Sequence, residues 1–214
     1  MAAPDSVLTR DDLAAWTFEG TALAVLGHPI GHSISPAMHN AALGVMAATD
    51  PRFKSWKYFR FDVPPVDLGA ALALLHEKRF HGLNLTVPHK ILAVPQVVAI
   101  DPAAAKIGAV NTLIWTAKGW SGYNTDGHGL ATGLREDLGF DLAGANVVLL
   151  GAGGAARGAA VECLRRRCAS LWIANRTPEN LQRLIAELAA IAAGIPLRGF
   201  DPSVPPAELP AGAI

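Results

Sequence analysis

The sequence contains few cysteines and no histidine arrangement that is typical of a metal site. Its two cysteines, Cys163 and Cys168, lie five residues apart in a segment with helical spacing. That number and spacing do not fit a zinc site, so we expect buried core residues or free thiols. None of the seven histidines stands in an acidic or cysteine-rich frame with ligand spacing. The sequence therefore predicts no bound metal.

An excess of charge of either sign is also lacking, since the formal net charge is zero. Lysines and arginines are spread along the chain except for Arg165-Arg166-Arg167. We interpret these three arginines as the carboxyl end of a helix, where positive charge is favoured. This distribution argues against a nucleic-acid partner.

Long apolar runs are absent as well. No run approaches the roughly 20 residues that span a bilayer, and the first residues lack the basic-then-apolar pattern of a signal peptide. We therefore expect a cytoplasmic protein with no membrane partner. A monomer and a homodimer both stay open.

Apolar material for a core is plentiful, at 51% hydrophobic residues in 214. That length suggests two domains, at roughly 150 residues per domain. In the first ninety residues strand-like runs, at 21–26, at 56–61 and from Gly82, alternate with helical spacing from Ser35 and over 66–78. Such alternation predicts an α/β domain with a mostly parallel sheet.

The two helices are expected to bury one face each. The first has Ser35 as its predicted N-cap, followed by Pro36. Its residues expected to face inward are Met38, Ala41, Ala42 and Val45. In the second helix the inward residues are Leu68, Leu72 and Leu75.

The stretch Gly82 to Lys90 is the first candidate for chemistry. Apolar residues alternate with Asn84 and Thr86, which predicts a short strand with two hydrogen-bonding side chains on one face. Pro88 is expected to end the strand. Lys90 then follows its carboxyl end, where open α/β sheets bind ligands.

The chain after Lys90 changes character. Prolines in 91–106 predict a broken helical connection, and 109–115 pairs with 120–123 as a hairpin. Asp126 stands at the start of a helix over 127–138 that ends at Gly139. A carboxylate there has two interpretations: it is a structural charge at a helix N-terminus, or it takes part in the chemistry of the site.

A glycine-rich turn follows the apolar strand 147–150. Its residues are Gly151, Ala152, Gly153, Gly154, Ala155 and Ala156. A helix with Ala160, Val161 and Leu164 and a second strand at 170–174 come next. In this context the pattern predicts a Rossmann turn whose small residues let a pyrophosphate approach the backbone.

The residues after the second strand bear on which dinucleotide binds. The segment Asn175-Arg176-Thr177 contains no carboxylate for ribose hydroxyls, and Arg176 offers a planar guanidinium suited to a 2′-phosphate. This favours NADP over NAD. The alternative interpretation, that Thr177 and Pro178 merely open a helix, uses different atoms and is compatible with it.

Taken together, these segments resemble the shikimate dehydrogenase family. The motifs that carry the resemblance occur in the family's order: Gly31-His32-Ser33-Ile34-Ser35-Pro36, Asn84-Leu85-Thr86-Val87-Pro88-His89-Lys90, Gly108-Ala109-Val110-Asn111-Thr112, Asn124-Thr125-Asp126-Gly127, the glycine-rich turn and Asn175-Arg176-Thr177.

The resemblance implies NADPH-dependent reduction of 3-dehydroshikimate to shikimate, and its reverse, in the pathway to chorismate and the aromatic amino acids. It implies that Ser33 and Ser35 hold the substrate carboxylate, that Thr86, Asn111 and Asp126 bind ring hydroxyls, and that Lys90 and Asp126 form the catalytic pair. The chemistry of the residues agrees, because hydride transfer needs an acid–base group at the oxygen of the reacting carbon. An ordinary ion pair between Lys90 and Asp126 is the alternative.

We expect a substrate domain at 1–125, a connecting helix and linker at 126–145 and a partial NADP-binding domain at 146–214. A Rossmann domain has about six strands, whereas here two are clear and a third is possible near Leu197. We therefore favour a fragment over a shortened relative, with strand 147–150 as an uncovered apolar edge. A quinate/shikimate dehydrogenase using NAD and a non-catalytic shikimate-binding fragment remain alternatives.

Overall fold

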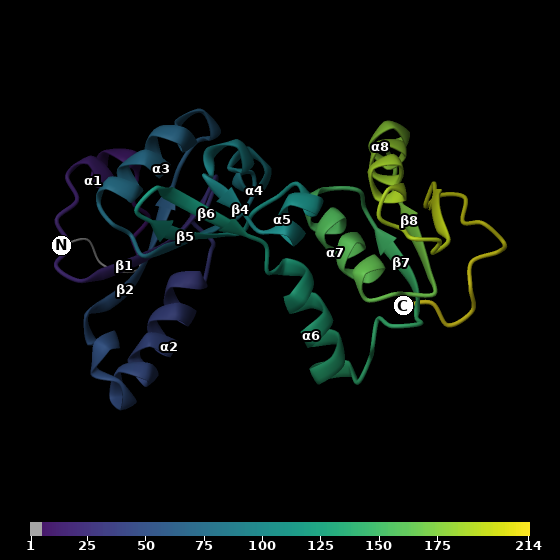
Figure 1. Ribbon diagram of the computed structural model, residues 1–214, viewed down its shortest axis with the longest axis horizontal. Helices are drawn as coiled ribbons and strands as arrows, with labels where there is room; N and C mark the ends of the chain where they lie inside the picture. Colours follow the sequence, from purple (N-terminus) through teal and green to yellow (C-terminus); the bar gives the residue numbers. More distant parts are fainter. Residues whose placement is uncertain (1–5) are drawn as a thin grey trace. The chain divides into compact units, whose positions relative to one another are not determined.

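The computed structural model describes residues 6–214 (Figure 1). The chain divides into two compact units, Met1–Asn124 and Thr125–Ile214. Among the described residues, no helix has the length and apolar character that crossing a membrane requires.

Strands and helices alternate through most of the first unit, which ends in a β-hairpin. The strands are β1 (Thr21–Gly27), β2 (Trp56–Asp62), β3 (Gly82–Leu85), β4 (Ala99–Ile100), β5 (Thr112–Thr116) and β6 (Gly119–Tyr123). The helices are α1 (Arg10–Ala14), α2 (Ser35–Thr49), α3 (Leu68–Glu77), α4 (His89–Leu92) and α5 (Pro102–Ile107), with short 3-10 turns η1 (Pro51–Ser55), η2 (Pro65–Asp67) and η3 (Val94–Gln96).

These six strands form one mixed sheet in the order β2-β1-β3-β5-β6-β4. β1 lies between β2 and β3 and is parallel to both, β5 is antiparallel to its two neighbours, and β4 is parallel to β6. The predicted α/β class with a mostly parallel sheet is confirmed. The hairpin of β5 and β6 and the broken connection between Lys90 and β5 are also as expected.

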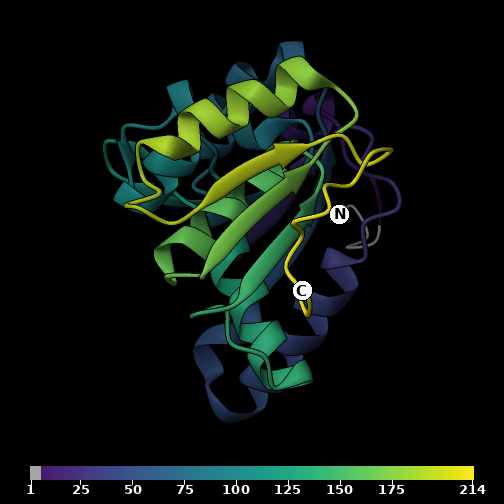
Figure 2. The same ribbon diagram turned by 90° about the vertical axis from the view of Figure 1, so that its right-hand side faces the viewer.

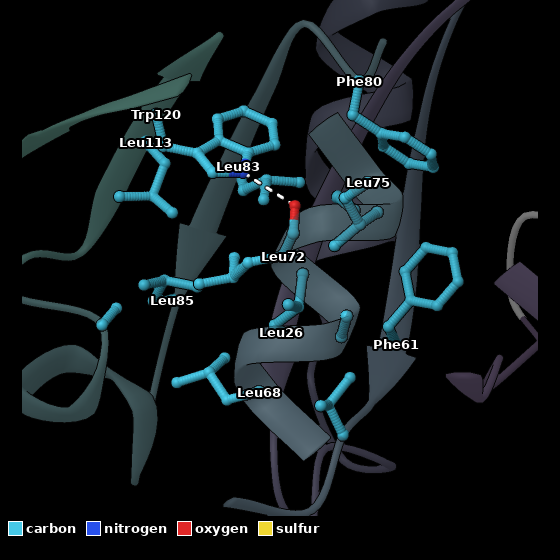
Figure 3. Close-up of a cluster of buried hydrophobic side chains, with 14 of the residues drawn as sticks. Leu26, Phe61, Leu68, Leu72, Leu75, Phe80, Leu83, Leu85, Leu113 and Trp120 are labelled. Atoms are coloured by element: carbon cyan, nitrogen blue, oxygen red, sulfur yellow. Dashed lines mark hydrogen bonds between the residues drawn. The ribbon is translucent and has the colours of Figure 1, made fainter. Parts of the chain in front are cut away.

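One face of this sheet is covered by α3 (Figure 3). Its buried leucines, Leu68, Leu72 and Leu75, recur every three or four positions and pack with strand residues such as Leu26 and Leu83. The core also contains a polar contact, because the indole Nε1 of Trp120 donates to the backbone oxygen of Leu72 at 2.9 Å. Burial of this apolar face stabilises the helix, as the spacing predicted.

The predicted inward face of α2 was wrong. Met38, Ala41, Ala42 and Val45 are exposed, and the buried residues of the helix are Pro36 and Leu43. The apolar residues surround this helix, so periodicity did not single out a face. The inward face is instead set by Asn40, whose side chain exchanges two 2.9 Å hydrogen bonds with the backbone of Tyr58.

The N-cap prediction for α2 was also wrong. The helix begins at Ser35 itself, and Ile34 occupies the N-cap position. The hydroxyl oxygen of Ser33 accepts a hydrogen bond from the Ser35 backbone N–H at 3.3 Å. The serine that satisfies a helix N–H therefore lies two residues earlier than expected.

The second unit contains a smaller sheet. Its elements are α6 (Asp126–Leu138), β7 (Asn146–Leu150), α7 (Gly154–Arg165), β8 (Ser170–Ala174), α8 (Pro178–Ala189) and β9 (Leu197–Phe200). The strands are parallel in the order β7-β8-β9 and run side by side in Figure 2. This is the strand order of the first half of a Rossmann sheet, and β9 is the third strand that the sequence left as possible near Leu197.

The outer edge of β7 differs from the expectation of an uncovered edge. The backbone N–H of Ile214 donates to the oxygen of Asn146 at 3.0 Å, and the Val148 N–H donates to the oxygen of Ile214 at 2.7 Å. These bonds satisfy the first backbone groups of the edge. Leu150, at its end, is 82% exposed.

Both cysteines are free and buried, as predicted. Burial raises the pKa of the Cys163 thiol to about 12, and it raises the pKa of Cys168 as well. The unreactive thiol is therefore the favoured form of both side chains at neutral pH.

Replacement of Leu75 by alanine tests the packing of α3. The side chain is fully buried, so Leu75→Ala is expected to lower the free energy of unfolding by about 2–5 kcal/mol. Denaturant unfolding followed by circular dichroism measures the change. The matched control is Val66→Ala in η2, where the side chain is 91% exposed, and equal losses in the two variants would contradict the assignment of this core.

Candidate functional site

Three of the predicted site residues are joined through the backbone at the carboxyl end of β3. Thr86 follows the last residue of the strand, and Lys90 lies in the first turn of α4. The Val110 N–H donates to the oxygen of Lys90, and the Leu85 N–H donates to the oxygen of Asn111, each at 2.8 Å. Thr86, Lys90 and Asn111 are therefore held in one region of the first unit.

The Ser33 and Ser35 segment follows β1, the parallel neighbour of β3. Parallel strands end at the same edge of a sheet, so this segment and Thr86 leave the sheet together. The approach is close, because a Cβ at Gly27 would lie 2.6 Å from Cγ2 of Thr86. A side chain at position 27 would therefore have to displace Thr86. The His28 N–H donates to the oxygen of Val87 at 3.1 Å and joins the two segments.

Arg60 holds the serine segment from β2. Its Nη1 donates to the backbone oxygens of Gly31 and Ser33, at 2.7 and 2.8 Å. This role of Arg60 was not predicted from the sequence. A single arginine inside an aromatic strand was the signal, because such a charge needs partners when it is partly buried.

His89 is the one fully buried histidine of the described residues. Neither ring nitrogen makes a well-aligned hydrogen bond within residues 6–214, although the backbone of Val63 and of Gly27 lies close. Burial lowers the pKa of His89, opposed by these backbone groups and by Asp62, while His28 adds to the lowering. The imidazole is therefore neutral at pH 7.

Asp126 is the first residue of α6, so its carboxylate lies at the positive end of a helix. Helix α6 packs on α7 at Gly127, where a Cβ would lie 2.8 Å from Cβ of Glu162. Burial raises the pKa of Glu162, but hydrogen bonds from Arg165 and Arg166 outweigh it and lower the pKa overall. Both arginines donate to this buried carboxylate at 2.8 Å, in addition to ending α7 as predicted.

The glycine-rich turn has the conformation that its pattern predicted. Gly151 has a φ of +117°, which L side chains rarely adopt, and its N–H donates to the oxygen of Ala174 at 2.7 Å. Gly153 is the N-cap of the 12-residue helix α7. Nothing lies within 4 Å of a Cβ built on Gly151 or on Gly153. The loop thus leaves space for a phosphate group at a helix N-terminus.

Of the other residues of this turn, Ala152 lies between Gly151 and Gly153, and Gly154 and Ala155 are the first two residues of α7 and are exposed. After β8, the side chain of Asn175 donates to the oxygen of Thr177 at 2.9 Å. Arg176 is exposed. Thr177 occupies the N-cap position of α8, but its side chain makes no capping hydrogen bond.

The residues of this unit fit a dinucleotide with a 2′-phosphate. The open glycine turn can receive a pyrophosphate, and the exposed guanidinium of Arg176 stands at the end of the next strand, where the ribose is bound in Rossmann sheets. No group of three or more metal-ligating side chains is found in residues 6–214.

Two family models match the chain in sequence order. The shikimate dehydrogenase substrate binding domain matches residues 25–113, and the shikimate / quinate 5-dehydrogenase domain matches residues 134–200.

Individual relatives agree with these matches. A shikimate dehydrogenase (NADP(+)) of Moorella thermoacetica is 49% identical over 174 residues, which cover 81% of this chain and 56% of the relative. One of Geobacter metallireducens is 39% identical over 183 residues, covering 86% of this chain and 62% of the relative. This chain therefore spans about three fifths of the length of these curated relatives.

A solved structure is similar in fold as well. The shikimate 5-dehydrogenase of Thermus thermophilus, in complex with NADP(H) and shikimate, is 34% identical with a TM-score of 0.73. The match covers 84% of this chain and 62% of that one.

The buried imidazole of His89 predicts a pH dependence of stability. Its folded pKa lies below the value near 6.5 of an unfolded chain, so the unfolded state binds more protons as the pH falls below about 6.5. Stability is then lost on acidification and is unaffected at higher pH. We expect His89→Leu to weaken the fall in the free energy of unfolding between pH 7 and pH 5.

Urea unfolding at several pH values measures this dependence. His128→Leu, on an exposed position of α6, is the matched control. His39, whose pKa burial also lowers, stays in both proteins. An unchanged pH dependence in His89→Leu would show that this histidine is not the group that titrates.

Proposed function

This chain belongs to the shikimate dehydrogenase family, as its motifs predicted, and from that premise we propose that it catalyses the NADP(H)-dependent interconversion of 3-dehydroshikimate and shikimate, in the biosynthesis of chorismate and the aromatic amino acids. The observation that carries the proposal is the backbone hydrogen bond from the Val110 N–H to the oxygen of Lys90. It brings the proposed acid–base group and the proposed hydroxyl-binding Asn111 to the carboxyl end of β3.

The substrate has a carboxylate and ring hydroxyls, and the proposed site has groups for each. Ser33 and Ser35 lie on a segment held by Arg60, and their hydroxyls can donate to the carboxylate. The guanidinium beneath this segment favours negative charge nearby. The side chains of Thr86, Asn111 and Asp126 can each exchange hydrogen bonds with ring hydroxyls.

Lys90 is the proposed acid–base group. In the direction of reduction, the reacting carbonyl carbon receives a hydride while its oxygen takes a proton from the Lys90 ammonium, which yields the alcohol. In oxidation the alcohol proton returns to the amine as hydride leaves the carbon. A positioned group of this kind contributes roughly 10²–10⁴-fold to the rate.

Asp126 is the proposed partner of Lys90. Its carboxylate would orient the Lys90 ammonium and take part in the proton transfer. The motif Asn124-Thr125-Asp126-Gly127, which helps to carry the resemblance to the family, supports this pairing.

The glycine turn and Arg176 would hold NADP(H), which supplies or accepts the hydride when bound. Backbone N–H groups from Ala152 to Ala155 would face the pyrophosphate, favoured by the positive end of α7, while Gly151 would make the turn that lets the phosphates approach. Arg176 would bind the 2′-phosphate, with Asn175 and Thr177 shaping the loop around it.

Replacement of Lys90 tests the proposed chemistry. Lys90→Ala is expected to lower kcat for shikimate oxidation by at least about a hundredfold, because the proton then has no positioned acceptor. Shikimate affinity, measured by calorimetry, is expected to change little. Lys106→Ala, an exposed lysine of α5, is the matched control, and near-normal turnover in Lys90→Ala would overturn the assignment.

Replacement of Arg176 tests the choice of cofactor. Arg176→Ala removes charge-assisted hydrogen bonds to the 2′-phosphate, so the Kd for NADP+ is expected to rise roughly ten- to hundredfold. The Kd for NAD+ should stay unchanged. Fluorescence titration measures both constants. Arg183→Ala on α8, where the side chain bonds to nearby Asn180, is the control, and parallel losses for both cofactors would contradict 2′-phosphate recognition.

A further inference from the structure

The side-chain amide of Asn111 needs a fixed orientation to bind a ring hydroxyl. Its Oδ1 only accepts and its Nδ2 only donates, so a flip exchanges the two functions. In this protein the hydroxyl of Thr112 donates to Oδ1 of Asn111 at 2.8 Å. Asn111 is 8% exposed, and its orientation therefore depends on buried neighbours.

Thr112 belongs to a chain of hydrogen bonds that begins on β2. The Tyr58 hydroxyl donates to Oδ1 of Asn84 at 2.7 Å. The Nδ2 of Asn84 then donates to the Thr112 hydroxyl oxygen at 3.3 Å. A hydroxyl has one hydrogen, so a Thr112 oxygen that accepts from Asn84 directs its own hydrogen to Asn111.

A backbone carbonyl fixes which groups donate and which accept in this series of hydrogen bonds. The Nδ2 of Asn84 also lies 3.4 Å from the backbone oxygen of Asn111 and donates to it. In the flipped arrangement two oxygens would face each other there without a hydrogen between them. The amide end of Asn84 near Asn111 must therefore be the NH2 group, which leaves Oδ1 of Asn84 to accept from Tyr58.

Tyr58, the first donor in this series of hydrogen bonds, is held by several contacts. The residue is 2% exposed, its backbone exchanges two 2.9 Å hydrogen bonds with Asn40, and its ring stacks on His39 at 4.2 Å between centroids. Burial raises the pKa of the Tyr58 hydroxyl. The hydroxyl therefore remains protonated, and remains a donor, through the physiological pH range.

We propose that Tyr58 is a positioning residue for substrate binding, which acts through Asn84 and Thr112 to hold Oδ1 of Asn111 away from the substrate and to present its NH2 group to a ring hydroxyl oxygen. The inference rests on the proposed function only for the identity of the ligand. The orientation of Asn111 is a property of the protein without ligand and can be measured separately.

Tyr58→Phe removes the hydroxyl and keeps the ring that stacks on His39. The KM for shikimate is expected to rise roughly three- to tenfold, the size of one lost hydrogen bond. The kcat should stay within about twofold, since the proton transfer assigned to Lys90 does not pass through this chain of hydrogen bonds. Tyr123→Phe is the matched control, because Tyr123 is the other tyrosine of the sequence and is partly exposed.

A double-mutant cycle separates positioning from general loosening of the sheet. In an Asn111→Ala background, Tyr58→Phe is expected to have no further effect on KM, because the group that it orients is already absent. Additive effects of the two replacements on KM would overturn the proposal.

The ligand-free protein gives an independent readout. Tyr58→Phe is expected to shift the side-chain amide resonances of Asn111 in a nitrogen–proton correlation spectrum, although the two side chains are not bonded to each other, and Tyr123→Phe should leave them in place. Unchanged Asn111 resonances in Tyr58→Phe would overturn the proposal. Shifted resonances in a protein that binds no shikimate would support the positioning and refute the proposed substrate.

Thr112→Val provides a second break in the chain of hydrogen bonds, next to Asn111. It is expected to shift the same resonances and to raise KM in the same way. It therefore replaces Tyr58→Phe as the test where that variant fails to fold. Asn111 resonances that match the unmodified protein in Thr112→Val would count against the proposal in the same way.

Discussion

The pairing of β3 with its neighbours is the constraint on which the proposed substrate site depends. The parallel pairing with β1, in which Leu26 is opposite Leu85, makes the serine segment and Thr86 leave the sheet at the same edge. The antiparallel pairing with β5, in which Asn84 is opposite Thr112, brings Asn111 to that edge from the other direction. A shift of one residue in either register would turn every side chain of β3 to the opposite face, so the arrangement tolerates no slippage.

Hydrogen-bonded polar side chains lie near this edge, of which Tyr58 is buried and Asn84, Thr112 and Arg60 are half-buried. Tyr58, Asn84 and Thr112 form a directed chain of hydrogen bonds, and Arg60 on the same strand as Tyr58 donates to the serine segment. Tyr58 and Arg60 are two residues apart in β2 and therefore lie on the same face of the sheet. From that face Tyr58 bonds to Asn84 of β3, and Arg60 bonds to the serine segment. The glycine turn of the second unit is built in the opposite way, from small residues that leave the backbone open.

Some features of the fold could not be predicted from the sequence, for physical reasons that the structure makes plain. The inward face of α2 could not be found by periodicity, because apolar residues occur on all its sides and a polar residue, Asn40, makes the decisive bonds to Tyr58. The edge of β7 was expected to be bare, and Ile214 pairs with it through the backbone, which side-chain patterns do not record. Arg60 and Tyr58 were read only as parts of a strand, since the partners of their side chains lie far away in the sequence.

The sequence by itself determined the α/β class, most strands and helices, the glycine turn and the family, because each depends on local spacing or on contiguous motifs. The roles proposed for Lys90, Asn111 and Asp126 also came from those motifs and remain predictions. Only the tertiary structure decided which segments meet at the end of β3, which histidine is fully buried, and which side chains link Tyr58 to Asn111 by hydrogen bonds. These depend on strand register and on hydrogen-bond direction between distant residues, and neither quantity is encoded in local sequence.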